Sequence, residues 1–375
     1  MTRKLLPLLL LALSAPAWGY TWAYYAKITV PHAQVSGSSD LSNFTVTVEL
    51  SDASFKSSGA GGQINHTVAF NGQTVPADLV FTTDSTCATY GMNWDIESYD
   101  GTNGIVWAHV LIPTLSHTVD TVFYACYGST PTTYLGGAIG SAYDTYVAGQ
   151  WNLATNTAVS LVDSSTNGNN LTVSSGGYTN LVLATGVFDG AGTGGNYHLL
   201  YTSVSPPGLA MNTQHVTIRM WLNVSTNNQP RDIAWKASNY WDFGINGSGK
   251  VYCDFYGGGI RSVVGSTTLS ISTWYHVACV LRTTGLYVYV NGIPDGSSLG
   301  SWTPDTNSDA LNIGDAGNTS NYTIDNVGVA SLDRSPDWLV TEANNGTVAS
   351  FAMVSAIGAC CSAASTAVTM TPIIM

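Results

Sequence analysis

The chain has 375 residues, of which 45% are hydrophobic and only 9% are charged, and its formal net charge is −12. Only 11 residues are Lys or Arg. Binding to nucleic acid or to anionic lipid requires clustered positive side chains, so this composition argues against both partners. The length predicts two domains, and the 39 glycines among many polar turn residues favour short strands over helices.

The first 19 residues have the pattern of a secretory signal peptide. Arg3 and Lys4 are followed by an apolar run over residues 5–13 and by a small-residue cleavage region over 15–19. The apolar run is far shorter than the roughly 20 residues needed to cross a bilayer. We therefore expect an exported protein, secreted or at the cell surface, with no transmembrane segment after signal removal.

Residues 20–130 are predicted to form a first all-β domain. The clearest strand covers residues 43–50, where Phe44, Val46, Val48 and Leu50 alternate with polar side chains. Other strand-like runs cover residues 68–70, 79–82, 94–98, 105–112 and 119–127, with short turns between them. Residues 131–150 are rich in Gly, Ala, Thr and Tyr, which predicts a linker.

Four segments of this first domain resemble a known family. They read ADLVFT (77–82), NWDIESYD (93–100), WAHVLIP (107–113) and DTVFYACYG (120–128). Together they are similar to a bacterial exported domain, the domain of unknown function 2341 family. That family often directly precedes a laminin-G-like domain, and the resemblance implies no established activity.

The second half is organised around a predicted hairpin at residues 271–292. One apolar run covers residues 274–281, and a second, at 286–290, alternates strictly between aliphatic and Tyr side chains. Gly285 ends the polar connection, and Asn291-Gly292 supplies a further turn because both residues tolerate positive φ.

This hairpin resembles the middle of a laminin-G-like domain of the concanavalin-A-like lectin/glucanase superfamily. Similar motifs flank it in the family's order: VFDG (187–190), VTIRMWL (216–222), LNIG (311–314) and TIDNV (323–327). The resemblance implies a jelly-roll sandwich over residues 151–350. The expected fold is therefore all-β, with two β-sandwich domains, of which the second is a concanavalin A-like (laminin G-like) jelly roll.

Two features are expected after these strands. Residues 335–346 form the best helix candidate, with Ser335 suited to the N-cap, Pro336 to the first helical position and Gly346 to the end. Residues 351–375 are small and uncharged, which predicts a tail.

Six cysteines in an exported chain permit disulfide bonds. We hypothesise pairing within each domain, Cys87 with Cys126 and Cys253 with Cys279, although the sequence alone leaves other pairings open. The adjacent Cys360 and Cys361 are expected to stay free or to form intermolecular bonds.

Asp95, Glu97 and Asp100 raise the question of an enzyme. Retaining glycosidases of the lectin/glucanase superfamily use paired carboxylates on one face of a strand, and residues two apart on a strand share a face. These carboxylates nevertheless lie in the first domain, and the laminin-G-like half has no matching acidic motif. The favoured interpretation is a solvated strand edge, and the protein is predicted not to be an enzyme.

The laminin-G-like resemblance implies a calcium ion at the rim, held by Asp189, Asn196 and Asp325. Calcium binds hard oxygens from carboxylates, amides and backbone carbonyls. The chain departs from the family at Asn326, commonly Glu, and at Asn196, commonly Asp, which would weaken the site. The alternative is that Asp189 and Asp325 only hydrogen-bond to turn backbones.

Aromatic residues near predicted loops of the second domain are the candidate ligand-binding residues. Sugar rings stack on aromatic faces, while nearby amides and carboxylates bind their hydroxyls. The candidates are Trp235, Tyr240, Trp241, Tyr256 and Trp302. They predict non-catalytic recognition of a polysaccharide or surface glycan. The alternatives are a structural or adhesive module that binds a surface protein, and a glycan-degrading enzyme.

Overall fold

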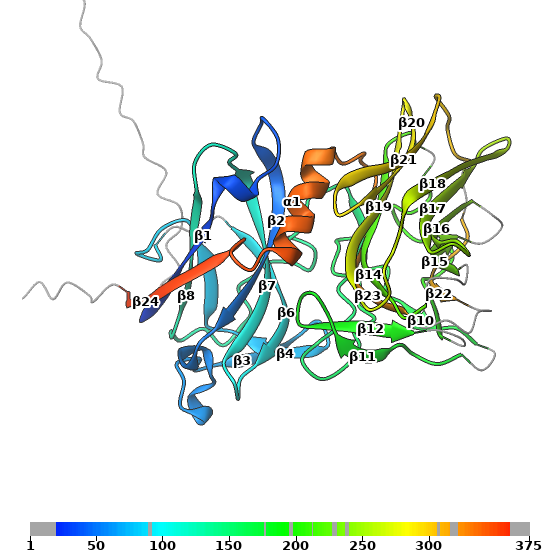
Figure 1. The fold of residues 1–375 in the computed structure, drawn as a ribbon. Helices are drawn as coiled ribbons and strands as arrows, with labels where there is room; N and C mark the ends of the chain where they lie inside the picture. Colours follow the sequence, from blue (N-terminus) through cyan, green and yellow to red (C-terminus); the bar gives the residue numbers. More distant parts are fainter. Residues whose placement is uncertain are drawn as a thin grey trace, which may run out of the picture.

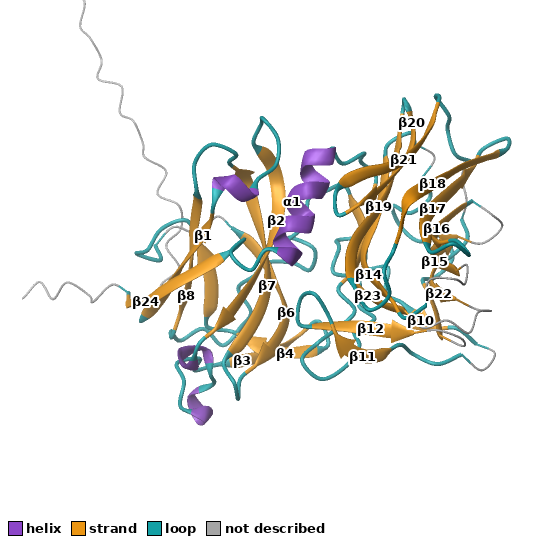
Figure 2. Cartoon of the chain, viewed as in Figure 1, coloured by secondary structure: helices purple, strands orange, loops and turns teal. Residues whose placement is uncertain are grey.

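The computed structural model describes residues 20–88, 92–175, 178–194, 198–211, 213–226, 231–236, 240–305, 308–315 and 322–360. Strands make up nearly all of the regular structure, as Figures 1 and 2 show. The only α-helix of these residues is α1 (Pro336–Thr347), and none of their helices has the length and apolar character that crossing a bilayer requires. The prediction of an all-β fold is confirmed, whereas the predicted signal peptide lies outside the described residues.

The first domain is a sandwich of two antiparallel sheets around one hydrophobic core. A four-stranded sheet has the order β24-β1-β8-β5, and a three-stranded sheet has the order β2-β7-β6, with β3 and β4 forming a separate hairpin. In β2, the alternating Phe44, Val46, Val48 and Leu50 are buried, as predicted. The strands are β1 (Tyr24–Val30), β2 (Leu41–Ser51), β3 (Thr67–Phe70), β4 (Gln73–Pro76), β5 (Leu79–Thr82), β6 (Asn93–Asp100), β7 (Ile105–Leu115), β8 (Thr121–Tyr127) and β24 (Met353–Ala359).

The C-terminal strand β24 belongs to this first domain although the second domain precedes it in the chain. It pairs antiparallel with β1, with Tyr24 opposite Ala359 and Thr29 opposite Met353, and the two strands lie side by side in Figure 1. The prediction of a tail from residue 351 is therefore wrong for residues 353–359. The sequence MVSAIGA shows little alternation of apolar and polar residues. It becomes a strand by pairing with the edge of β1.

The second domain packs two larger antiparallel sheets face to face around its own core. The seven-stranded sheet has the order β10-β13-β22-β15-β16-β17-β18. The eight-stranded sheet has the order β11-β12-β23-β14-β19-β20-β21, with β9 also paired to β23. Their bounds are β9 (Val147–Trp151), β10 (Thr172–Val173), β11 (Val182–Thr185), β12 (Gly190–Gly194), β13 (His198–Tyr201), β14 (Val216–Val224), β15 (Arg231–Lys236), β16 (Trp241–Ile245), β17 (Lys250–Tyr256), β18 (Ile260–Thr268), β19 (Trp274–Arg282), β20 (Gly285–Val290), β21 (Ile293–Leu299), β22 (Leu311–Asp315) and β23 (Tyr322–Ala330).

The predicted hairpin and disulfides are present. Strands β19 and β20 pair from Val277–Val290 to Arg282–Gly285, and the next turn has positive φ at Asn291 (51°) and Gly292 (74°). Cys253 on β17 bonds to Cys279 on β19, which links the two sheets of the second domain through its core. Cys87 bonds to Cys126 in the first domain, so pairing within each domain is confirmed.

Helix α1 lies between the two domains, and it begins at the predicted capping residues. The Ser335 Oγ accepts a hydrogen bond from the Trp338 N–H (3.1 Å), and Pro336 occupies the first turn. Leu339 is fully buried against Ala278, Val280 and Tyr289 of the eight-stranded sheet. On the first-domain side, the Trp338 ring packs on Phe44 at a centroid distance of 4.8 Å.

Leu339→Ala should lower the free energy of unfolding by about 2–5 kcal/mol, because it deletes a buried leucine and leaves a cavity under α1. Leu299→Ala is the matched control: the same atoms are removed from a side chain that is 69% exposed, and the cost should stay within about 0.5 kcal/mol. Urea unfolding monitored by tryptophan fluorescence measures both. Equal costs for the two variants would contradict this role of the helix.

Candidate functional site

The two outer faces of the second domain differ in what covers them. Helix α1 and the first domain lie over the eight-stranded sheet, while the seven-stranded sheet lies on the side away from the first domain (Figure 1). On the covered face, Arg219 Nε lies 2.8 Å from Glu342 Oε1 of α1, and His276 Nε2 lies 3.3 Å from Glu342 Oε2. Intramolecular contacts therefore occupy that face.

Asp95 and Glu97 lie in the interface between the domains. Their exposed fractions are 3% and 2%, and Glu97 Oε2 lies 2.7 Å from Nε2 of His109, which is also buried. Asn326 and Ser164, both beyond the first domain, lie near enough to Glu97 and Asp95 to influence the pKa of these carboxyls. The interpretation of these carboxylates as a solvated strand edge is wrong, because the second domain covers them.

These buried groups favour their neutral forms. Burial raises the pKa of Glu97 well above its usual range, and the neighbouring Asp189 and Asp95 raise it further. Burial raises the pKa of Asp95 to about 6 and lowers that of His109 to about 4. At neutral pH the Glu97–His109 contact therefore joins a protonated carboxyl to a neutral imidazole, and it links β6 to β7 within the first domain.

The described residues predicted to bind calcium do not fit a metal site. The Asp325 carboxylate is fully buried, and its Oδ2 accepts hydrogen bonds from the N–H groups of Val187 (2.8 Å) and Phe188 (3.0 Å). Its Oδ1 accepts from the Asn326 amide (3.0 Å). Asp189 hydrogen-bonds to Ser98 of the first domain, and Asn196 lies outside the described residues. Within the described ranges, no three His, Cys, Asp or Glu side chains are grouped to hold a metal, and calcium binding stays a prediction.

The outer face of the seven-stranded sheet presents a row of side chains from five adjacent strands. Asn312 of β22 is opposite Trp235 of β15, which is opposite Asp242 of β16. The row continues through Asp254 of β17 to Ser262 of β18. Directly opposed residues point to the same face of a sheet, so the indole lies between an amide and two carboxyl groups. We call these five residues the sheet-face row.

Trp235 is the aromatic member of the sheet-face row. Its Nε1–H donates to the Gly314 carbonyl at 3.1 Å, which directs the indole along the sheet toward β22. The side chain is half-buried, as are Tyr252 and Tyr256, which lie two residues on either side of Asp254 on the same face of β17. The face therefore combines aromatic surface with polar groups.

The carboxyl groups of this face have raised pKa values. Partial burial together with Asp232 and Asp254 raises the pKa of Asp242 to about 7, and burial also raises that of Asp254 against a hydrogen bond from Ser262. Near neutral pH the face therefore carries both protonated and ionised carboxyls. Such a mixture can donate as well as accept hydrogen bonds, as recognition of hydroxyl groups requires.

The remaining predicted aromatic residues lie at one end of the same sheet. Trp241 is only 2% exposed and stacks on Phe255 in the core at a centroid distance of 6.4 Å, so its prediction as a ligand-binding residue is wrong. Trp302 is half-buried, donates its Nε1–H to the Gly257 carbonyl (2.8 Å) and packs edge-on against Phe255. Tyr240 is half-buried against the core, and its carbonyl accepts from the Tyr256 N–H.

Four members of the sheet-face row were missed from the sequence. They are Asn312, Asp242, Asp254 and Ser262. The alternation of β17, in which Tyr252, Asp254 and Tyr256 point outward between buried residues, is the one local signal that could have indicated this face. The register that joins the five strands is not readable from local patterns.

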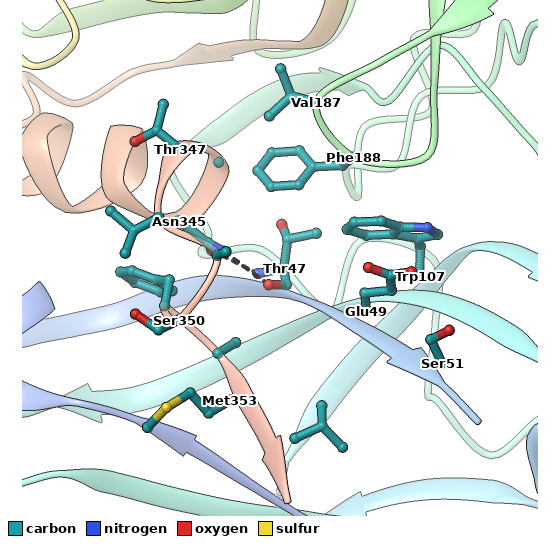
Figure 3. A pocket seen from close by; sticks show the side chains of 16 residues that line it. Thr47, Glu49, Ser51, Trp107, Val187, Phe188, Asn345, Thr347, Ser350 and Met353 are labelled. Atoms are coloured by element: carbon teal, nitrogen blue, oxygen red, sulfur yellow. Dashed lines mark hydrogen bonds between the residues drawn. The ribbon is translucent and has the colours of Figure 1, made fainter.

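A second concave surface lies between the domains (Figure 3). This interdomain groove has a volume of about 810 Å³ and is lined by β2, β7, the 187–188 turn and the segment from α1 to β24. Trp107 and Glu49 are opposite each other on β7 and β2, and the Trp107 ring meets Phe188 at a centroid distance of 6.1 Å. The Asn345 side chain accepts a hydrogen bond from the Thr47 N–H and donates one to the Thr47 carbonyl.

Part of the second domain is similar to a known family. Residues 193–338 match the family model Laminin_G_3, described as the concanavalin A-like lectin/glucanases superfamily. The first domain lies outside this match, so its resemblance stays a prediction. No curated protein matches the sequence.

Several solved structures are similar at low identity. The binding domain of Paraclostridial Mosquitocidal Protein 1 has 15% identity and a TM-score of 0.46, covering 53% of this chain and 52% of that one. The botulinum neurotoxin serotype D ligand binding domain, in complex with N-acetylneuraminic acid, has 14% identity and a TM-score of 0.44, covering 53% and 50%. Domain 4 of AbnA, an arabinanase from Geobacillus stearothermophilus, in complex with arabinotriose, has 14% identity and a TM-score of 0.40, covering 52% and 98%. The chain thus spans about half the length of the two toxin binding domains.

Asp95→Asn should stabilise the protein progressively as the pH rises. The raised pKa of Asp95 means that the folded wild type favours the protonated carboxyl. The contribution of this carboxyl to the stability of the wild type is therefore full below about pH 4 and is lost as the pH passes about 6. A rise of the pKa from 3.8 to about 6 corresponds to a free energy of unfolding that is roughly 3 kcal/mol higher for Asp95→Asn than for the wild type above pH 7. At pH 4 the two proteins should differ little in stability. Chemical unfolding across this pH range measures the effect.

Asp100→Asn, on the same strand, is the contrasting control. Hydrogen bonds from Asn103 and Thr102 lower the pKa of Asp100, so its contribution is present at neutral pH and is lost as the pH falls through the lowered value. This variant should therefore be destabilised at pH 7 and approach the wild type in acid. Parallel pH profiles for the two variants would contradict the buried placement of Asp95.

Proposed function

We propose that this protein binds a polysaccharide or a surface glycan without catalysis, through the outer face of the seven-stranded sheet. The observation that supports this most is the sheet-face row, in which Trp235 lies between Asn312 on one side and Asp242 on the other. A sugar ring stacked on the indole would place its hydroxyl groups near the amide and the carboxyls. The match of residues 193–338 to the lectin/glucanase superfamily supports the same proposal.

The size of the face suits an extended chain of sugars. Neighbouring strands lie about 4.8 Å apart, so a row across five strands extends over roughly 19 Å. This length accommodates several sugar rings side by side, whereas a single ring would contact Trp235 alone. Open sites of this kind bind weakly, on the order of 1 mM, and gain strength when several sites bind one polymer.

The absence of catalysis is part of the proposal. The carboxyls that raised the question of hydrolysis, Asp95 and Glu97, lie in the interface between the domains, and Glu97 contacts His109. The carboxyls of the sheet-face row belong to the seven-stranded sheet, which lies on the side away from the first domain (Figure 1). We also propose that the protein is exported, which its two buried disulfides support.

A structural or adhesive module is the second candidate. The same face has exposed apolar side chains at Ile260 (63% exposed) and Val264 (48%), directly opposite Tyr256 and Tyr252. Such a surface would suit a protein partner at the cell surface. Capture of an exported protein that free sugars do not displace would favour this candidate.

Trp235→Ala should weaken polysaccharide binding by at least about tenfold, or 1.4 kcal/mol, because the stacking surface is lost. Native gel electrophoresis in gels that contain soluble polysaccharides measures the retardation, which suits weak binding. Trp107→Ala, in the interdomain groove, is the matched control and should bind like the wild type. Circular dichroism establishes that both variants are folded.

Three results would contradict or relocate the proposed site. Normal retardation of Trp235→Ala with lost retardation of Trp107→Ala would assign binding to the groove. Retardation by none of a broad polysaccharide panel would contradict glycan binding. Release of reducing ends from a retarded polysaccharide would contradict the absence of catalysis. Running the gels with calcium and with chelator also tests the predicted calcium dependence.

A further inference from the structure

The free edge of strand β2 faces the interdomain groove. In the order β2-β7-β6, β2 is an outer strand of its sheet, and among the described residues it pairs with no strand other than β7. Three alternate residues of β2 line the groove, and they are Thr47, Glu49 and Ser51 (Figure 3). The direction of their backbone groups decides what the groove can bind.

The contact of Thr47 with helix α1 shows this direction. The Thr47 N–H donates to the side-chain oxygen of Asn345 (2.8 Å), and the Thr47 carbonyl accepts from the Asn345 amide (2.9 Å). Both backbone groups of Thr47 therefore point away from His109, its partner on β7. In an antiparallel pair of strands, hydrogen-bonded and non-hydrogen-bonded residue pairs alternate. Residues two apart on β2 consequently direct their backbone groups to the same side.

Glu49 and Ser51 follow Thr47 in an unbroken register with β7. Their N–H and C=O groups therefore point to the free side of β2, as those of Thr47 do. The carboxamide of Asn345 takes the place of a neighbouring strand at Thr47, and the next two positions offer two donors and two acceptors along the groove. A polypeptide in extended conformation presents matching groups at the same spacing.

The groove has room for such a polypeptide. Its volume of about 810 Å³ is within the usual range of ligand sites, roughly 300–1,000 Å³. Residues 346–354 form its other side, where the apolar side chains of Met353 and Val354 are 42% and 38% exposed. The rings of Trp107 and Phe188 add aromatic surface. A strand added to β2 would therefore have its backbone against β2 and apolar surface available for its side chains.

The charge of the groove selects one of those side chains. None of the residues that line the groove is Lys, Arg or His, and the side chain of Glu49 is exposed there. Partial burial and the neighbouring Asp189 raise the pKa of Glu49, and a cation beside its carboxyl would counter both effects. On an added strand, the residue directly opposite Glu49 would lie beside it on the same face, where opposite charges attract.

We propose that the interdomain groove docks an extended peptide segment of another protein, which adds as a strand to the edge of β2 and places a Lys or Arg opposite Glu49. The backbone hydrogen bonds supply affinity, and the charge at one position supplies the choice of partner. The sheet-face row belongs to the sheet on the side away from the first domain, so this docking site is independent of glycan binding (Figure 1).

Fluorescence anisotropy of labelled peptides tests the charge preference of the full chain. The probes are fluorescein-labelled nonapeptides of alternating Thr and Val, in which the central residue is Lys, Gln or Glu. We expect the Lys peptide to bind at least about tenfold more tightly than the Glu peptide, and added salt should reduce this difference. Glu49→Lys should reverse the order of these two peptides. Asp120→Lys is the matched control, since it makes the same charge change at an exposed carboxylate that does not line the groove, and it should retain the order of the wild type.

Methylation of the peptide backbone tests the strand pairing. Two versions of the Lys peptide carry N-methyl groups on alternate residues, one version on the odd positions and the other on the even positions. An added strand directs every second N–H toward β2. One version should therefore bind at least about tenfold more weakly than the other, and each serves as the control for the other because their side chains are identical.

Four results would overturn the proposal. Equal binding of the two methylated peptides would contradict strand addition, and equal binding of the Lys and Glu peptides would contradict selection by Glu49. Binding of none of the three probes at protein concentrations up to about 1 mM would contradict the docking site. A dimer in analytical ultracentrifugation that the Lys peptide dissociates would assign the groove to a second copy of this chain.

A competition experiment separates this proposal from the proposed glycan site. An excess of a polysaccharide that the protein retards in native gels should leave the Lys peptide bound, because the two ligands occupy different sides of the second domain. Displacement of the peptide by the polysaccharide would place both ligands at one site and contradict the independence of the groove. Peptide binding by a protein that retards no polysaccharide would support the groove and contradict only glycan binding.

Discussion

The carboxylate of Glu342 fixes the arrangement on which the other features depend. It lies on α1 between Arg219 Nε (2.8 Å) and His276 Nε2 (3.3 Å), both on the outer face of the eight-stranded sheet. Burial alone would raise the pKa of Glu342, but Arg219, His276 and Arg334 together hold it below its usual value. A buried charge that loses its partners is costly, so this contact specifies where the helix lies more than it adds net stability.

The position of α1 decides how the two domains meet. With Glu342 and Leu339 on the sheet, the opposite side of the helix presents Trp338 and Asn345 to the first domain. Asn345 accepts from the Thr47 N–H and donates to the Thr47 carbonyl, so β2 lies against the helix in one register. The carboxyls and the imidazole of β6 and β7 are then enclosed, and burial shifts their pKa values toward the neutral forms.

The two faces of the second domain therefore have different electrostatic requirements. On the covered side, Glu342 of α1 is paired with a cation, and Glu97 of the first domain is kept protonated by burial. On the open face, Asp242 and Asp254 are opposite each other on adjacent strands, and Asp254 helps to raise the pKa of Asp242. Two like charges directly opposed on a sheet are unfavourable for stability. Their placement on the one uncovered face is what a surface selected for recognition, rather than for packing, would show.

Local sequence patterns predicted the strands, turns and helix start that interactions between neighbouring residues determine. Three features that depend only on neighbours in sequence were found as predicted: the alternation of residues 43–50, the Asn291-Gly292 turn and the helix start at Ser335-Pro336. Trp241 was misassigned because Trp235 and Trp241 differ only in the side of the strand they point to, which the register of β15 and β16 sets. Asp95 and Glu97 were misassigned because an alternating strand does not reveal that a second domain covers its polar face.

The pairing of β24 with β1 also could not be predicted from local patterns, because the paired residues lie far apart in the sequence. Its partner residues, such as Tyr24 and Ala359, are separated by nearly the whole described chain, and no local signal in residues 353–359 compensates for that distance. Until β24 is added, β1 is an unpaired edge, which is a site for pairing with other chains. Pairing over such a separation is slow to form, because the loop must close before the contact stabilises it. Since the loop between β1 and β24 contains the second domain, the first domain needs strands from both ends of the described chain to complete its sheet. The second domain is therefore inserted within the first.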